Sequence, residues 1–319
     1  MFKVSYNRAL LRFRLETVTP LAIRAGETGL DPTAVDLACV RTNHVQHGTT
    51  VYIPGSSLKG VIRSAAEAAV RGRTFRHLGG QETSGACDPL DHRASCARHA
   101  PKGREQVPSS SVHQRNCLAC RAFGSLSIKG RCALRDLFPF SRAGELSDDD
   151  RSNLERANRV ELRHGIAIDR ISGAVAGKAL FEQEVIPVGV RFYGEATLHN
   201  YQAWQLGLLF TVFDELDQGF AQLGSSKSRG QGVVSVTPLS LVHEQRTGHA
   251  RSPKAVGDLV DDATRRDYGL FAEHPLPAAP GAPRGLSSRF EVDPEHIGAW
   301  RNAGLHALGQ LHGASQEAR

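Results

Sequence analysis

Two groups of residues in this chain have the types and the spacing that a chemical site requires. The first consists of four cysteines in the pattern C-x8-C-x20-C-x2-C, namely Cys87, Cys96, Cys117 and Cys120. One C-x2-C pair with two further thiols suits tetrahedral zinc, which binds thiolate and imidazole ligands. Because four protein ligands leave no position open for water, we expect structural Zn²⁺ here and not a catalytic metal.

The residues around these cysteines indicate what the metal would do. Residues 79–111 are rich in Gly, Ser, Pro and His and have almost no periodic hydrophobicity, so a hydrophobic core cannot order them. Metal binding would supply that order. Several alternatives stay open: His92, His99 or His113 could replace a cysteine, the thiols could be free or form a redox pair, and the metal could serve a small-molecule zinc enzyme. Cys39 and Cys132 have apolar neighbours, as buried thiols do.

The second group lies in residues 52–63, Tyr-Ile-Pro-Gly-Ser-Ser-Leu-Lys-Gly-Val-Ile-Arg, which predict a short strand that turns into a helix. A helix N-terminus presents unpaired N–H groups and a partial positive charge. We expect Ser56 or Ser57 to cap this helix, and Lys59 and Arg63 share one of its faces. The pattern predicts a site for a phosphate-sized anion, with an ordinary capped helix as the alternative.

Positive charge is concentrated around both groups. The chain has a net charge of +6, yet the segment from Arg41 to Arg142 alone holds 16 Lys/Arg against 6 Asp/Glu. The rest of the chain is therefore slightly acidic. A basic block of this kind indicates a polyanionic partner, nucleic acid above all, although arginine-rich proteins are also basic without such a partner.

The periodicity of apolar residues predicts the elements that position these groups. A strand followed by a helix near the N-terminus is echoed later by a strand, a helix and a strand, with a glycine-rich loop before the last. This order predicts an α+β protein with a ferredoxin-like, RRM-like core and helices on one face of the sheet. The expected elements are strands over 8–18, 51–53, 188–198 and 233–236, helices over 58–72 and 204–220, the second capped by Asn200, and the loop 223–232.

Long insertions interrupt this core, which we place at residues 1–245. One is the zinc-binding loop at about 79–120, and the other is a region at about 137–187 with strands at 160–169 and 179–185 around a glycine-rich turn. Residues 246–319 form a C-terminal extension with a linker at 275–285 and a terminal helix that Asp293-Pro294 opens. The chain has no run of 18 apolar residues and no apolar stretch at its start, so we expect a cytoplasmic protein without a membrane span.

Four motifs in this order resemble the RAMP superfamily of CRISPR-associated proteins, and most closely the backbone subunits of type III effector complexes. They are Tyr-Ile-Pro-Gly-Ser-Ser-Leu-Lys-Gly at 52–60, Cys-Leu-Ala-Cys-Arg-Ala-Phe-Gly at 117–124, Ile-Asp-Arg at 168–170 with the glycine turn and Glu184 that follow, and the glycine-rich loop at 223–232. The resemblance extends from about Arg8 to Val236.

The resemblance implies a subunit that binds guide CRISPR RNA, stacks with copies of itself as a filament and joins other effector subunits in antiviral defence against target RNA. The helix and the glycine-rich loop would contact the guide backbone, and a thumb-like hairpin at about 163–185 would displace a base at intervals. The implied RNA-binding residues are Ser56, Ser57, Lys59, Arg63, Arg170, Lys227, Ser228 and Arg229.

The resemblance also implies a catalytic residue. In several relatives an aspartate in the first long loop cleaves target RNA with a divalent cation such as Mg²⁺, and Asp36 stands at the matching place, with Asp31 as a second candidate. Two alternatives remain. The protein could be a scaffold that relies on a separate nuclease, or an endoribonuclease that processes the guide precursor with His44, His47 or His164 as general base.

Overall fold

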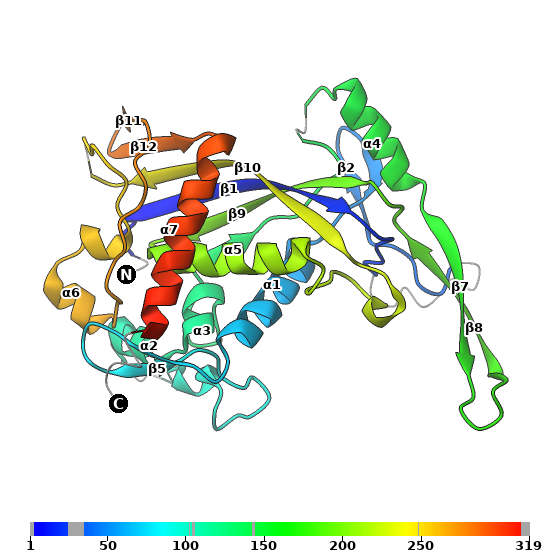
Figure 1. The fold of residues 1–319 in the computed structure, drawn as a ribbon, viewed down its shortest axis with the longest axis horizontal. Coiled ribbons are helices and arrows are strands. Elements are labelled where there is room, and N and C mark those ends of the chain that lie inside the picture. Colours follow the sequence, from blue (N-terminus) through cyan, green and yellow to red (C-terminus); the bar gives the residue numbers. More distant parts are fainter. Residues whose placement is uncertain are drawn as a thin grey trace.

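Strand β1 (Asn7–Thr17) lies inside a six-stranded sheet whose order is β11-β12-β10-β1-β9-β6 (Figure 1). It pairs antiparallel with β10 (Val234–Gln245) on one side and with β9 (Arg191–His199) on the other. Its side chains alternate as predicted, with Leu11, Phe13 and Leu15 buried and Arg12 exposed. The predicted half-buried strand is therefore confirmed, and its two faces meet different environments.

The computed structural model describes residues 3–24, 35–101, 103, 106–141, 144–247 and 249–313. Asp31, the second candidate for catalysis, lies outside these ranges. Within them, the helices are all too short or too polar to cross a membrane.

The mixed α/β character and the antiparallel sheet agree with the fold class predicted. Along the chain, β1 is followed by α1 (Gly55–Val70), β6 (Cys132–Leu134), β9, α5 (Ala203–Asp217) and β10. Phe13 of β1 packs on Phe213 of α5, with ring centroids 4.9 Å apart, so α5 covers the face of the sheet opposite to Arg12. The sheet thus has one face under helices and one face that carries polar side chains.

The chain after residue 245 adds to the same sheet. Strand β12 (Ser287–Val292) pairs with β10, and β11 (Gly281–Arg284) pairs with β12. The C-terminal helix α7 (Pro294–Gly313) packs on α5 so closely that a Cβ on Gly207 would lie 2.0 Å from the Gly304 carbonyl oxygen. Part of the linker predicted at 275–285 is therefore an edge strand, a position that tolerates Pro283. The 3-10 turn η3 (Val256–Leu259) and α6 (Asp262–Asp267) precede these elements.

The two insertions form separate structures. The first contains mostly short elements, and the second contains a helix and a long hairpin that projects from the body of the molecule (Figure 1). The hairpin was predicted, but its second strand begins at Val175 and not at residue 179. The elements of the first are β4 (Thr74–Arg76), β5 (Glu82–Ser84), η1 (Cys96–His99), α2 (Ser109–Arg115) and α3 (Leu118–Phe123), and those of the second are α4 (Asp148–Asn158), β7 (Glu161–Ile168) and β8 (Val175–Val185). A small hairpin of β2 (Arg41–His44) and β3 (Gly48–Val51) precedes α1.

Both predicted helix caps are wrong. Helix α1 begins at Gly55 after Pro54, and no side chain of the capping residue bonds to it. Ser56 and Ser57 lie inside the first turn, and the N–H of Gly55 is bound by a distant carboxylate, described below. Helix α5 begins after Gln202, whose N–H donates to the side-chain oxygen of Gln205 at 2.9 Å, while Asn200 has a left-handed φ of 48°.

Candidate metal centre and nucleic-acid interface

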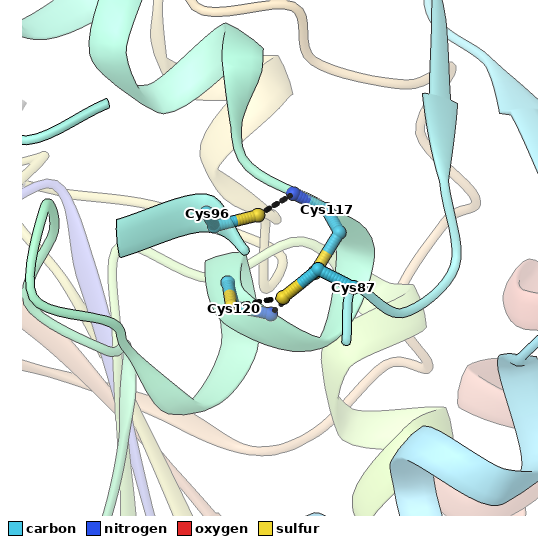
Figure 2. A group of neighbouring side chains, drawn as sticks. All are labelled: Cys87, Cys96, Cys117 and Cys120. Atoms are coloured by element: carbon cyan, nitrogen blue, oxygen red, sulfur yellow. Dashed lines mark hydrogen bonds between the residues drawn. The ribbon is translucent and has the colours of Figure 1, made fainter. Parts of the chain in front are cut away.

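The four predicted cysteine ligands converge in the structure. Their Sγ atoms all lie within 4.8 Å of one another, and all four residues are buried (Figure 2). Cys87 follows β5, Cys96 begins η1, Cys117 is the N-cap residue of α3, and Cys120 lies in the first turn of that helix. The Sγ atoms of Cys87 and Cys120 are 3.7 Å apart, close to the edge of about 3.8 Å that Zn–S bonds of 2.3 Å give in a tetrahedron. The set fits Zn²⁺ without a histidine.

Backbone N–H groups donate hydrogen bonds to two of these sulfur atoms, which favours their thiolate form. The N–H of Cys117 donates to Cys96 Sγ at 3.2 Å, and the N–H of Cys120 donates to Cys117 Sγ at 3.4 Å (Figure 2). Hydrogen bonds from the Cys120 and Cys96 thiols lower the pKa of Cys117, whereas the same contacts with Cys117 raise the pKa of Cys120. Metal binding would displace the protons that these thiols hold.

The histidines considered as substitutes lie elsewhere. Among the described residues, none of His92, His99 and His113 belongs to the group that could hold a metal. The ring of His113 is buried between the carbonyl oxygen of Tyr268 and the guanidinium of Arg131, at 2.9 and 3.0 Å. The two remaining thiols, Cys39 and Cys132, are buried as predicted.

Arg63, predicted as an RNA contact, faces the cysteine cluster. Its Nε bonds to Glu67 Oε1 at 2.7 Å, its Nη1 donates to the Gly124 carbonyl at 3.1 Å, and its Nη2 lies 3.7 Å from Cys120 Sγ. Arg71, which directly follows the last residue of the helix, donates to the Cys87 carbonyl at 3.2 Å. These contacts occupy most of the Arg63 donors.

The first turn of α1 lines a groove of about 1180 Å³. Ser56 and Ser57 are exposed and Lys59 is half-buried. The N–H of Gly55, however, donates to Asp136 Oδ1 at 2.7 Å. A carboxylate of the protein therefore occupies part of the predicted anion site. The side chains of Ser56 and Ser57 remain exposed to solvent beside it.

The other walls of this groove come from the polar face of the sheet and from the segment after β6. Arg12 and Arg135 both contact Glu195, at 2.9 and 2.7 Å, so one carboxylate partly neutralises two cations. Aromatic rings complete the wall. The ring of Phe138 stacks on the rings of Tyr52 and Phe140, with centroid-to-centroid distances of 5.9 and 5.4 Å. His44 and Tyr193 also line the groove.

The aromatic rings of this groove were not predicted from the sequence. Phe138 and Phe140 alternate in the stretch Leu-Phe-Pro-Phe at 137–140, at the start of the second insertion. Phe140 is buried, whereas the ring of Phe138 is half-buried and is the one of the two that a base could reach.

The glycine-rich loop meets the base of the projecting hairpin. Lys227, Ser228 and Arg229 form the exposed 3-10 turn η2. The Arg229 guanidinium lies over the ring of Phe181 in β8, 6.0 Å from its centroid, and both residues line a second cavity of about 430 Å³ with Arg24 and Leu37. Two segments predicted to bind RNA thus lie side by side.

Asp36 lies next to this second cavity. Its carboxylate is exposed and accepts a hydrogen bond from the N–H of Glu182 in β8 at 3.0 Å, and the neighbouring N–H of Leu37 donates to the Glu182 carbonyl at 3.2 Å. In the part of the chain that the structure describes, Asp36 joins no group of three or more metal-ligating side chains. Arg170 is exposed at the far turn of the hairpin and belongs to neither cavity.

The fold and these sites define a class of protein: a mixed α/β molecule with a buried four-cysteine centre and a grooved sheet face that carries arginines and aromatic rings. The chain belongs to the RAMP superfamily, because the model of that family matches residues 14–235. Membership implies a CRISPR-associated, RNA-binding role, with CRISPR RNA and effector subunits as partners. This confirms the resemblance found from the motifs. No curated protein matches the chain.

Proposed function

We propose that the protein is a guide-RNA-binding backbone subunit of a CRISPR ribonucleoprotein effector that targets RNA in antiviral defence. The observation that carries this proposal is the groove of about 1180 Å³ in which Ser56 on α1 meets Arg12, Arg135 and the ring of Phe138. Cations and hydroxyls suit phosphates, and rings suit unpaired bases. Single-stranded RNA is the ligand that uses both at once.

The path of the chain supports an RRM-like core. The elements β1, α1, β6, β9, α5 and β10 follow one another with the sheet order β10-β1-β9-β6, which is the arrangement of a split βαβ fold. RRM-like proteins bind single-stranded RNA on the face of the sheet that helices leave open. Arg12, Tyr193 and Glu195 stand on that face here.

In this proposal the second cavity and the hairpin contact the same guide RNA as the groove. Lys227, Ser228 and Arg229 contact the backbone of the guide, while the hairpin that ends near Arg170 acts as the thumb that displaces a base. Copies of the protein follow one another along one guide, next to other effector subunits and, where present, a separate nuclease. Such contacts fix the position of RNA without reading its sequence, as pairing between guide and target requires.

Cleavage of the target through Asp36 is the finer part of the proposal. An exposed carboxylate at the base of the hairpin could hold Mg²⁺ together with phosphate oxygens and water, since Mg²⁺ often uses one or two carboxylates and keeps several waters. The alternative is a scaffold that relies on another nuclease. A cleaving subunit and a scaffold would both bind RNA in the groove, and only the cleaving subunit would cut target RNA.

RNA binding is tested with the purified full chain and a labelled single-stranded oligoribonucleotide. We expect binding that weakens steeply as salt rises, because neutralised phosphates release counterions, and weaker binding to a duplex of the same length. The Phe138→Ala variant should bind more weakly by about 1–3 kcal/mol per stacked base. Absence of binding at low salt would refute the proposed function.

Cleavage is tested with paired guide and target RNA and added Mg²⁺. The Asp36→Asn variant keeps an oxygen for the Glu182 N–H and removes the charge, so target cleavage should be lost while RNA binding stays. Asp267→Asn, at an exposed aspartate of α6, is the matched control. Equal cleavage by Asp36→Asn and the parent chain would exclude Asp36 from the reaction.

Processing of the guide precursor is a second candidate that one observation favours. His44 lines the groove beside Arg135 and Ser56, where a base could take the proton of a ribose hydroxyl. Cleavage of unpaired repeat RNA without added metal, abolished in His44→Ala, would support this activity. If the repeat RNA binds but is not cleaved, processing is excluded and only the guide-binding role remains.

A further inference from the structure

Helix α1 is shared by the groove and the cysteine cluster. Its first residues, Gly55 and Ser56, line the groove. Two turns further on, its Arg63 side chain reaches Cys120, and Arg71 near its end reaches the carbonyl of Cys87. A helix with intact backbone hydrogen bonds is a stiff element, so a shift at one end displaces the other.

Two side chains of α1, Arg63 and Glu67, form a clamp on the cluster together with Arg71, which directly follows the helix. The carboxylate of Glu67 is 12% exposed and lies between Arg63, at 2.7 Å, and Arg71, at 3.7 Å. Their spacing of four residues places all three on one face of the helix. Glu67 thereby holds both guanidinium groups toward Cys120 and Cys87. This clamp explains why Arg63 is turned away from the groove.

The opposite wall of the groove is attached to the same cluster through the chain. Cys120 lies in α3, and the segment 124–131 connects that helix to β6, which is followed by Arg135 and Asp136. Asp136 accepts the hydrogen bond from Gly55, and a Cβ on Gly55 would lie only 2.7 Å from the Leu134 carbonyl oxygen. The N-terminus of α1 and the segment 134–136, which form opposite walls of the groove, are therefore in direct contact.

Metal binding changes the charge that the clamp faces. Four thiolates around one Zn²⁺ are net negative, and the negative charge of the cluster is smaller while some of the thiols keep their protons. The ion therefore strengthens the attraction between the cluster and Arg63, at a site where 31% of the arginine side chain is exposed and solvent screens it only in part.

We propose that metal binding at the four cysteines sets the RNA affinity of the groove, and that Arg63 is the positioning residue that links the two. This inference rests on the proposed RNA-binding function and adds its regulation by the metal. Linkage requires that RNA and metal each strengthen the binding of the other by the same factor.

The experiment compares the full chain with Arg63→Gln, and with Arg73→Gln as a control at an exposed arginine just after α1. Metal affinity is measured by competition between the protein and a chromogenic zinc chelator. RNA affinity is measured with the labelled oligoribonucleotide before and after the chelator removes the metal, while circular dichroism reports whether the chain stays folded.

For the parent chain and Arg73→Gln we expect removal of the metal to weaken RNA binding about fivefold or more, within the usual range of coupling between sites. Arg63→Gln should bind Zn²⁺ more weakly, and its RNA affinity should respond little to the metal. If the metal-free chain unfolds, the comparison is made on metal-loaded proteins, where Arg63→Gln should weaken both affinities and Arg63→Lys should restore part of each.

Three results would overturn the inference. One is an unchanged RNA affinity in a folded, metal-free chain. Another is Arg63→Gln with weaker RNA binding and an unchanged zinc affinity, which would make Arg63 a direct RNA contact. The third is Arg63→Gln with both affinities unchanged. A metal-loaded parent chain that binds no RNA would instead refute the proposed function, so the two failures are distinct.

Discussion

The carboxylate of Asp136 accepts a hydrogen bond of 2.7 Å from the backbone N–H of Gly55, the first residue of α1. A helix N-terminus attracts anions because its first N–H groups lack partners. In this protein an acidic side chain from the segment after β6 already binds one of them. Phosphate approaching Ser56 therefore meets a nearby negative charge, which weakens the site and ties α1 to the opposite wall of the groove.

Replacement of Asp136 separates these two effects. Asp136→Asn keeps an oxygen for the Gly55 N–H, so the helix should lose only the charge–dipole part of the contact, about 0.3–1 kcal/mol of stability. Removal of the negative charge should raise the affinity for RNA several-fold at low salt. Asp136→Ala, which also loses the hydrogen bond, should destabilise the protein by about 1 kcal/mol. RNA affinity that falls in Asp136→Asn would show that the charge does not oppose binding.

The glycine-rich loop should contribute to RNA affinity without contributing to stability. Lys227 and Arg229 are exposed on η2, so their replacement by alanine leaves the core intact. Each variant should bind RNA more weakly and reduce the slope of log affinity against log salt by about one for each lost phosphate contact. Arg159→Ala, at an exposed arginine after α4, is the control. Slopes equal to that of the parent chain would place this loop outside the RNA path.

The cysteine cluster should bind one metal ion per chain, and the fold of the first insertion should depend on it. Cys96→Ser removes a ligand from η1 while leaving the C-x2-C pair, so we expect loss of zinc from elemental analysis and a lower melting temperature. Val112→Ala, in the apolar packing of α2, should also lower the melting temperature but keep the metal. A Cys96→Ser chain that retained full zinc and stability would contradict the four-cysteine site.

The sequence predicted the parts of this molecule that depend on local chemistry. The cysteines were found because their side chains have few uses in such a polar stretch, and β1 was found because Leu11, Phe13 and Leu15 alternate with arginines. The sheet class followed from the order of such elements. These inferences needed no knowledge of which distant residues meet.

The parts that were missed depend on contacts between distant residues. The serines were expected to cap α1, but the N–H of Gly55 is bound instead by Asp136, which lies 81 residues after Gly55 in the chain. Arg63 lies four residues after Lys59 and was expected to contact RNA, yet its side chain faces the cysteine cluster. The same holds for Glu195, which neutralises Arg12 from another strand. Propensity and spacing cannot rank such partners, because tertiary contacts decide between them.

One buried histidine gives the stability of the sheet a defined pH dependence. The ring of His243 in β10 is 0% exposed and bonds to the Tyr201 hydroxyl at 2.8 Å and to Gln245 at 3.1 Å. It packs between the rings of Phe290 and Trp300, and Glu244 is the acidic group that acts on it. Burial lowers the pKa of His243 from 6.5 to about 4.

This pKa predicts that acid destabilises the protein through His243. Between pH 6.5 and about 4 the unfolded chain binds a proton at this residue that the folded chain does not, so the free energy of unfolding falls as pH falls. From about pH 7.5 to 5.5 the loss should be about 1.4 kcal/mol for this one group. His243→Gln keeps hydrogen-bonding groups and cannot titrate, so its stability, measured by urea unfolding, should fall by that much less over the same range. Any proton-driven loss of zinc affects both chains and cancels in the comparison. Equal pH dependence of the two proteins would mean that His243 stays neutral, or titrates alike, in both states.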